Sequence, residues 1–254
     1  MGNILITLST GYLDYTPTAS STYSTSYEDD NLKVYNNTQR HWRSNSSAQQ
    51  IIWLDCGASR NISGCVLMGT NFTTVSVQYG ASTVIGAVTT AYQFVTNENE
   101  RTGMRGGIQV LSTTGRYAKV TIPAQTASDG STYYKIGTIV LLSSSTITLQ
   151  KNPPSIDFTI DEEMSSNKFE GGNGEDVSLG NPMLTCTFGY DAINSTYESD
   201  FWKLARHSKA NTLVLSENTT DISKVYIMKR TSPVGVSRQA GVARVASIAF
   251  KEVG

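Results

Sequence analysis

Histidine and cysteine are scarce in this chain, and their scarcity limits the chemistry available to it. The 254 residues include two histidines, His41 and His207, which form no pair at metal-ligand spacing. Three cysteines, Cys56, Cys65 and Cys186, show no Cys-x-x-Cys spacing, so we interpret them as small core hydrophobes. The sequence also lacks a Gly-x-Ser-x-Gly elbow and a phosphate-cradling Gly-Lys-Ser/Thr. We therefore predict a protein that is not an enzyme and has no cofactor.

The chain also has few charged residues and no long apolar run. Charged residues make up 16% of the chain and the net charge is −1, without the basic excess of a nucleic-acid binder. The best apolar run, Ile136 to Leu142, is far shorter than the roughly 20 residues of a membrane-spanning helix. The start, Met1 to Thr16, has no basic region typical of a signal peptide. We expect synthesis in the cytosol of the producing cell, with no nucleic-acid partner and no membrane partner.

The chain is instead rich in Ser, Thr, Asn, Gly and Tyr, with short β-branched and aromatic runs between turn residues. Ile51 to Leu54, Ile62 to Met68 and Val75 to Tyr79 are typical strands, and the last alternates at period two. Further strands are expected at residues 84–95, 108–111, 117–122, 134–142 and 146–149. Gly11 to Ser26 has no apolar periodicity and is expected to be an irregular or extended lead-in. These patterns predict a mainly β protein that begins with an all-β domain.

Consecutive prolines in Lys151-Asn152-Pro153-Pro154 indicate a domain boundary, because they remove ladder donors and disfavour helix before them. The predicted domains are residues 1–150 and 151–254. In the second, strands are expected at residues 156–160, 183–190, 212–215, 224–228 and 242–250. One helix is expected between Ser195 and Lys209, with Phe201 and Leu204 on one face. Asp161 to Asn181 is rich in Glu and Gly, which predicts a flexible acidic loop.

Three segments of the first domain together resemble the discoidin family, the coagulation-factor C-type branch of the galactose-binding-like fold. Residues 30–44 contain an Asp-Asn turn followed by Trp-Arg-Ser. Residues 51–66 contain Leu-Asp-Cys-Gly and then Ile-Ser-Gly-Cys-Val, and residues 115–139 contain Gly-Arg-Tyr and a closing Ile-Gly-Thr-Ile. The resemblance spans roughly residues 28–143 and implies a jelly-roll β-sandwich.

The resemblance implies structural roles for individual residues. Trp42 would fill one end of the sandwich, Asp55 and Arg116 would tie neighbouring strands, and Gly57 and Gly137 would allow close turns. Two departures from the family pattern are extra residues between Asn31 and Trp42, and Cys56 where the family usually has Leu. Ligand binding does not follow from the resemblance alone.

The second domain resembles, in its order of elements, the tail-tube and distal-tail folds of tailed phages, in which sheets pack with one helix. This implies a C-terminal β-sandwich with one flanking helix that assembles into a ring of identical subunits and contacts other phage tail proteins. A long early loop reaches a neighbouring subunit in such folds. In this chain the residues expected to form that assembly loop are Lys168, Glu170, Glu175 and Asp176. The first functional hypothesis is therefore a structural protein of the virion, located in the tail or baseplate.

The second hypothesis is a carbohydrate-binding module, in which loops at one end of the first domain hold a glycan. Its candidate ligand-binding residues are Tyr35, His41, Trp42 and Tyr92. Asp29, Asp30 and Asn31 supply carboxylate and amide oxygens suited to calcium, and some discoidin-like domains carry such a site. A solvated acidic turn explains the same three residues without a metal. Nothing in the sequence separates the virion and glycan hypotheses decisively.

Overall fold

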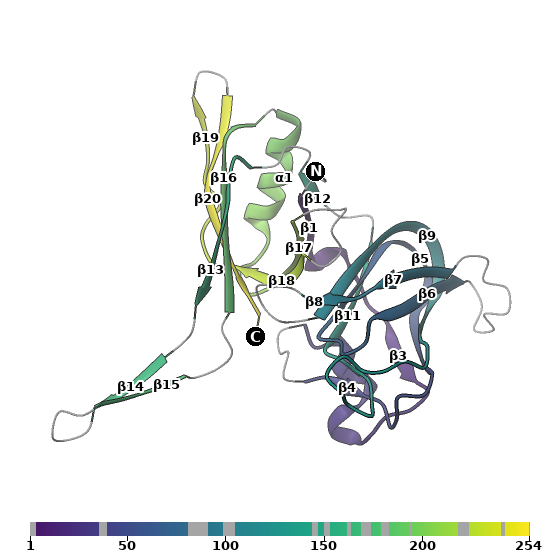
Figure 1. Ribbon diagram of the computed structural model, residues 1–254. Helices are drawn as coiled ribbons and strands as arrows, with labels where there is room; N and C mark the ends of the chain where they lie inside the picture. Colours follow the sequence, from purple (N-terminus) through teal and green to yellow (C-terminus); the bar gives the residue numbers. More distant parts are fainter. Residues whose placement is uncertain are drawn as a thin grey trace. The chain divides into compact units, whose positions relative to one another are not determined.

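The computed structural model describes residues 4–35, 40–80, 91–98, 105–143, 147–149, 153–161, 164–168, 174–178, 183–193, 195–217, 224–239 and 242–253. The chain divides into two compact units (Figure 1). Unit 1 comprises residues 1–152 and 212–227, and unit 2 comprises residues 153–211 and 228–254. The change at residue 152 falls at the double proline. Residues 212–227, which the sequence prediction assigned to the C-terminal domain, belong to unit 1.

A β-sandwich forms most of unit 1. Its main sheet has the strand order β2-β11-β5-β9-β6-β7, with β3 beside β5 and β8 beside β9, and a short ladder pairs β10 with β4. The strands are β2 (Tyr12–Leu13), β3 (Thr16–Ala19), β4 (Trp42–Arg43), β5 (Gln50–Met68), β6 (Thr74–Gly80), β7 (Ala91–Val95), β8 (Asn97–Glu98), β9 (Arg105–Ile122), β10 (Lys135–Ile136) and β11 (Thr138–Leu142). The predicted mainly β sandwich is confirmed.

Two long bent strands build both layers of the sandwich. Segments expected as separate strands join into β5, which has 19 residues, runs beside the 18-residue β9 and curves with it in Figure 1. The ladder shifts register between Asp55 and Arg60, where Gly57 has a φ of +72° and donates its N–H to the Asp55 carboxylate at 2.8 Å. A bulge increases local bending, so the halves of β5 on either side of it face one core. Ile52 and Cys65, from the two halves, both belong to that core.

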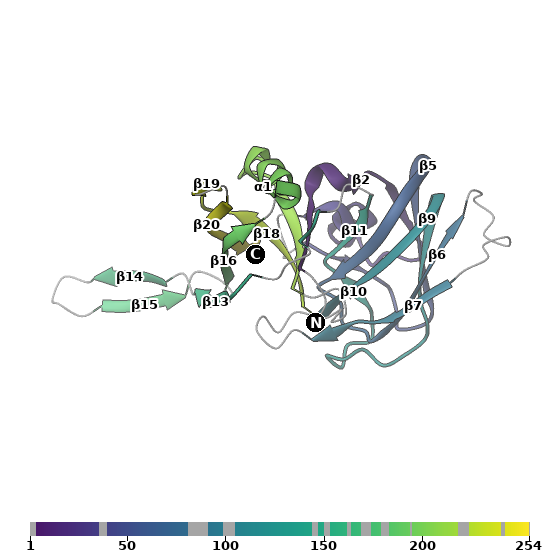
Figure 2. The ribbon, with the colours of Figure 1, turned by 90° about the horizontal axis from the view of Figure 1, so that it is seen from above.

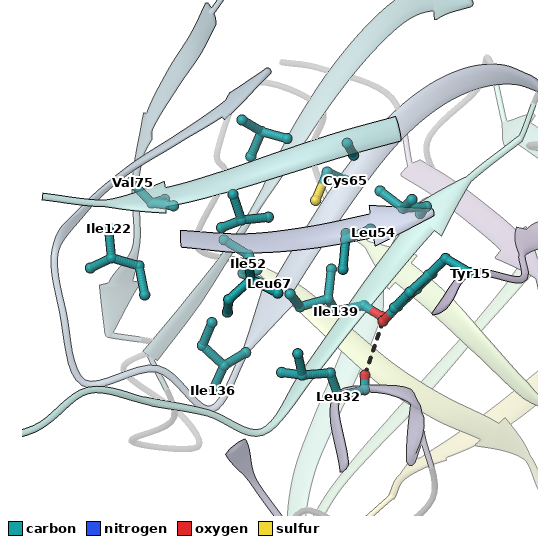
Figure 3. Packing of buried hydrophobic residues seen from close by; sticks show 14 of the residues in the cluster. Tyr15, Leu32, Ile52, Leu54, Cys65, Leu67, Val75, Ile122, Ile136 and Ile139 are labelled. Carbon is teal, nitrogen blue, oxygen red and sulfur yellow. Dashed lines mark hydrogen bonds between the residues drawn. The ribbon is translucent and has the colours of Figure 1, made fainter. Parts of the chain in front are cut away.

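The core of the sandwich contains aliphatic side chains together with larger rings. Figure 3 shows Tyr15 entering it, with its hydroxyl directed toward the Leu32 carbonyl at 3.2 Å. The same hydroxyl lies 2.7 Å from the Ile139 carbonyl, so this buried polar group is satisfied. Trp42 and Tyr134 are also fully buried. Each large apolar side chain buried in this way contributes about 1.5–3 kcal/mol to the free energy of unfolding.

The N-terminal segment is more regular than the sequence indicated. Within the expected lead-in, β3 pairs with β5, placing Pro17 opposite Leu54, and 3-10 turns follow at η2 (Thr25–Tyr27) and η3 (Asp29–Lys33). Proline lacks an N–H to donate, and it is tolerated here because β3 is an edge strand. Before it, β1 (Ile4–Leu8) is paired with β17 (Thr212–Ser216) and with β12 (Ile147–Leu149). The β1–β17 pairing explains why residues 212–227 belong to unit 1.

Unit 2 contains a sheet in the order β20-β16-β13. β20 also pairs with β19 and with residues 228–230 at the end of β18. The strands of unit 2 are β13 (Ile156–Asp161), β16 (Met183–Ile193), β19 (Val236–Gln239) and β20 (Val242–Glu252), together with residues 228–230 of β18 (Val225–Arg230), whose residues 225–227 belong to unit 1. The predicted helix is confirmed as α1 (Ser195–Arg206), which buries Phe201 against Tyr190 of β16. Across the described ranges, no helix has the length and apolar character needed to cross a membrane.

The expected acidic loop contains a hairpin. β14 (Met164–Lys168) pairs with β15 (Gly174–Ser178), and Ser166 lies opposite Asp176. The two strands form a two-stranded sheet of their own, drawn as a pair of antiparallel arrows in Figures 1 and 2. Antiparallel pairing of two segments close in sequence outweighs the low apolar content that favoured a loop. The prediction of an irregular segment was therefore wrong for these two stretches.

Candidate functional site

Two neighbouring residues on a short strand face opposite ways, and this alternation creates the candidate site. Trp42 and Arg43 form β4, which pairs with β10 so that Ile136 lies opposite Trp42 and Lys135 opposite Arg43. Successive side chains of a strand point to opposite faces. Trp42 is fully buried, whereas Arg43 is only half-buried. The same alternation just before β10 buries Tyr134 and leaves Tyr133 partly exposed.

The outward residues gather into a cluster of rings around one guanidinium. The Arg43 Cζ atom lies 3.8 Å from the ring centroid of Tyr23 and 3.7 Å from that of Tyr133. Tyr27 extends the cluster, with its centroid 6.0 Å from that of Tyr23 and 5.0 Å from that of His41. We call Tyr23, Tyr27, His41, Arg43 and Tyr133 the Tyr–Arg platform. Tyr23 is 54% exposed, so the platform presents an aromatic surface to solvent.

Hydrogen bonds fix the loop that carries Tyr23. The Tyr23 N–H donates to the Arg43 carbonyl at 2.9 Å, and the Trp42 indole N–H donates to the Ser21 carbonyl at 3.1 Å. The Asn45 N–H donates to the Ser21 hydroxyl at 3.2 Å. A loop held by three hydrogen bonds loses little conformational freedom on binding, so the platform is pre-organised.

The structure brings only one of the predicted ligand-binding residues into the platform. His41 belongs to it through its contact with Tyr27. Trp42 precedes Arg43 on β4, but it is fully buried, so its ring offers no face to a sugar and its role is structural. Tyr35 packs edge-on against Tyr12 with centroids 5.3 Å apart, and burial raises the pKa of its hydroxyl to about 12. Tyr35 is therefore part of a different aromatic contact.

The remaining predicted residues lie outside the platform or outside the described structure. Tyr92 is on β7, where its backbone pairs with Val77 of β6. In the predicted assembly loop, Lys168 lies opposite Gly174 and Glu175 opposite Asn167 in the hairpin, and Asp176 lies opposite Ser166. Glu170 lies outside the described residues.

The turn predicted for calcium is held together by its own hydrogen bonds. The Asn31 amide donates to the Ser26 carbonyl at 3.0 Å and to the His41 carbonyl at 3.2 Å, and an Asp29 carboxylate oxygen accepts the Ala19 N–H at 3.1 Å. The Asn31 bonds use the amide nitrogen as donor, whereas a calcium ion would bind the amide oxygen. No cluster of three or more His, Cys, Asp or Glu capable of holding a metal ion is found in the part of the chain that the structure describes. The calcium site stays a prediction, and the Asn31 amide ties the turn to the platform through the His41 carbonyl.

The strand-tying roles implied by the discoidin resemblance are present. Arg116 binds Asp55 with two hydrogen bonds, at 2.8 and 2.9 Å, across β9 and β5. The hydrogen bond from Arg116 lowers the pKa of Asp55 below its usual value. Gly137 approaches the Met68 carbonyl so closely that a Cβ would lie 3.2 Å from it. These contacts stabilise the sandwich and lie outside the platform.

Sequence analysis missed Tyr23, Tyr27, Arg43 and Tyr133. Tyr23 lies in the segment interpreted as an irregular lead-in, and Tyr27 directly follows that segment. Tyr133 lies in a loop far along the chain. A usable signal was present in the pairs Trp42-Arg43 and Tyr133-Tyr134, because one member of each pair must face outward if the other is buried.

Comparisons with known proteins give a fold-level result. No protein-family model matches the chain, and no curated protein does either. Among solved structures, chitosan-binding module 1 of a chitosanase/glucanase from Paenibacillus sp. IK-5 is similar, with 19% identity, a TM-score of 0.40, and 52% of this chain and 96% of that chain covered. A Streptococcus pneumoniae fucose binding module has 7% identity and a TM-score of 0.40, covering 52% of this chain and 95% of that chain. CpGH89CBM32-5 from Clostridium perfringens, in complex with GalNAc-beta-1,3-galactose, has 13% identity and a TM-score of 0.41, covering 52% and 99%.

Similarity at these identities and TM-scores carries no argument about ligands. None of these three structures is a phage protein by its description, so the predicted phage tail-tube domain and its ring assembly gain no support from them. The case for a function rests on the Tyr–Arg platform.

Proposed function

We propose that the sandwich of unit 1 is a non-enzymatic carbohydrate-binding module and that the Tyr–Arg platform is its glycan site. The observation that carries this proposal is the exposed ring of Tyr23, held in place against the Arg43 guanidinium. A pyranose ring has an apolar face of C–H groups and a rim of hydroxyls. Sites for such ligands combine aromatic surface with a few well-placed polar groups.

The polar groups of the platform surround its aromatic surface. Arg43 supplies N–H donors, His41 supplies ring nitrogens, and the hydroxyls of Tyr23, Tyr27 and Tyr133 both donate and accept. With Tyr23 exposed, the platform would bind a sugar at the surface by stacking and by hydrogen bonds from its polar groups. Such a surface suits the end or the side of a glycan chain.

The proposal is tested by isothermal titration calorimetry with a glycan identified on an array by the wild-type chain. We expect Tyr23→Ala to weaken binding roughly 5- to 30-fold, corresponding to the ~1–2 kcal/mol of one aromatic anchor. Trp202→Ala is the matched control, because Trp202 is 42% exposed on α1 of unit 2. It should bind like the wild type, and circular dichroism should show both variants folded.

A second arm addresses the sheet face of the same sandwich. Trp53 on β5 is half-buried, and the Lys119 ammonium lies 5.6 Å from the centre of its ring. If Trp53→Ala abolishes binding while Tyr23→Ala leaves it intact, the glycan binds the sheet face and the platform assignment is wrong. If no glycan on the array binds, the proposed function itself fails.

A further inference from the structure

Arg43 differs from the other buried or half-buried arginines within the described ranges. Arg116 binds the Asp55 carboxylate, Arg105 donates to the Thr96 carbonyl at 2.7 Å, and Arg230 donates to the carbonyls of Ser232, Ala205 and His207. Arg43 makes no side-chain hydrogen bond and no ion pair with any described residue, and its contacts are with aromatic rings. Its Nε atom is buried without a partner. A partly desolvated cation with no counter-charge is costly, so the position is poised for an anion.

The geometry around Arg43 limits how an anion can reach it. Tyr23 and Tyr133 lie within 4 Å of the guanidinium carbon, in positions where rings cover guanidinium faces. The Nε side is closed by burial, whereas the two Nη atoms are not among the buried unpaired atoms. The open approach is therefore toward Nη1 and Nη2, in the plane of the group. Two parallel N–H donors match the two oxygens of a carboxylate.

We propose that the Tyr–Arg platform selects glycans that carry a carboxylate, such as uronic or sialic acids, through a bidentate contact with the Nη atoms of Arg43. This inference rests on the proposed function and adds the class of ligand. The aromatic rings would contact the sugar ring while Arg43 binds its acid group. The two nearby rings and the partial burial of Arg43 leave its guanidinium less hydrated than a fully exposed one, which strengthens an ion pair formed there.

A carboxylate explains the site better than hydroxyls alone. A neutral sugar also accepts hydrogen bonds from a guanidinium, but it leaves the buried charge uncompensated. A polyphosphate backbone such as that of a nucleic acid needs several basic groups, whereas the chain has a net charge of −1 and Arg43 is the one cation of the platform besides any charge on His41. One guanidinium between rings fits one carboxylate per sugar.

The test compares matched acidic and neutral ligands by calorimetry at pH 7. The pairs are sialyllactose with lactose, and trigalacturonate with its methyl ester. For at least one pair we expect the wild type to bind the acidic member about tenfold or more tightly, the gain of one good charge-assisted contact. Arg43→Gln should lower the affinity for that acid to the level of its neutral partner.

Two further variants separate geometry from general attraction. Arg43→Lys keeps the charge but loses the planar fork, so it should recover only a small part of the preference. Arg60→Gln removes the same charge from an exposed position on β5 and should leave the preference unchanged. Thermal unfolding by circular dichroism checks that each variant is folded.

The outcomes distinguish this inference from the proposed function. If neither acidic ligand is preferred and Arg43→Gln weakens neutral glycans equally, Arg43 binds hydroxyls, so the inference fails and the glycan function stands. If Arg60→Gln abolishes the preference for the acidic ligand as fully as Arg43→Gln does, that preference arises from long-range electrostatic attraction. The proposed bidentate contact is then wrong. Tyr23→Ala without effect on any ligand would overturn the platform itself.

Discussion

Replacing Trp42 tests whether its ring is structural, as its complete burial indicates. Trp42→Ala removes a fully buried indole from the end of the sandwich, and substitutions of this kind cost about 3–5 kcal/mol in the free energy of unfolding. The indole N–H also donates to the Ser21 carbonyl at 3.1 Å, and leaving that acceptor unpaired adds about 1 kcal/mol. Trp42→Phe keeps most of the apolar ring and should cost roughly 1–3 kcal/mol.

The assay is urea unfolding followed by far-ultraviolet circular dichroism, which does not depend on tryptophan emission. Trp202→Ala is the control, and we expect it to cost less than about 1 kcal/mol because that side chain is 42% exposed. A midpoint for Trp42→Ala equal to that of the control would refute the burial of Trp42. Trp42→Phe should also retain glycan affinity to within a few-fold, and a complete loss in a folded Trp42→Phe would mean that the indole contacts the ligand directly.

Two other predictions concern a buried acid and a turn. Burial raises the pKa of Glu252 to about 7, against the opposing effect of a backbone N–H from Leu184, so the folded state binds its proton more tightly than the unfolded state does. This tighter proton binding stabilises the folded state fully below about pH 4.5, and the stabilisation is lost as the pH rises to about 7. Glu252→Gln should therefore stabilise unit 2 at pH 8 by at most about 3 kcal/mol, measured by thermal or urea unfolding. A pH profile unchanged by this substitution would contradict the burial of the acid. Gly57→Ala should destabilise the sandwich by about 1–2 kcal/mol through backbone strain alone, because φ is +72° and no atom lies within 4 Å of the added Cβ. A cost near zero in urea unfolding would show that the β5 bulge relaxes.

The strand content and the strand-tying contacts could be predicted from the sequence. Period-two alternation in Val75 to Tyr79 corresponds to β6, and the apolar face around Phe201 corresponds to α1. Asp55 and Arg116 were matched through the discoidin resemblance, and they form the expected pair. These features depend on neighbours close in sequence or on a motif carried by a few residues.

The platform and the assignment of residues to units were decided by tertiary structure. Tyr23 and Tyr133 are 110 residues apart, and they meet at Arg43 only because β4 pairs with β10 and the Tyr23 loop is bonded to β4. Residues 212–227 join unit 1 because β17 finds its partner in β1, a pairing across more than 200 residues. Local propensity specifies that a segment is a strand, but the choice of partner depends on which long-range pairing buries the most apolar surface, and that energy belongs to the whole fold.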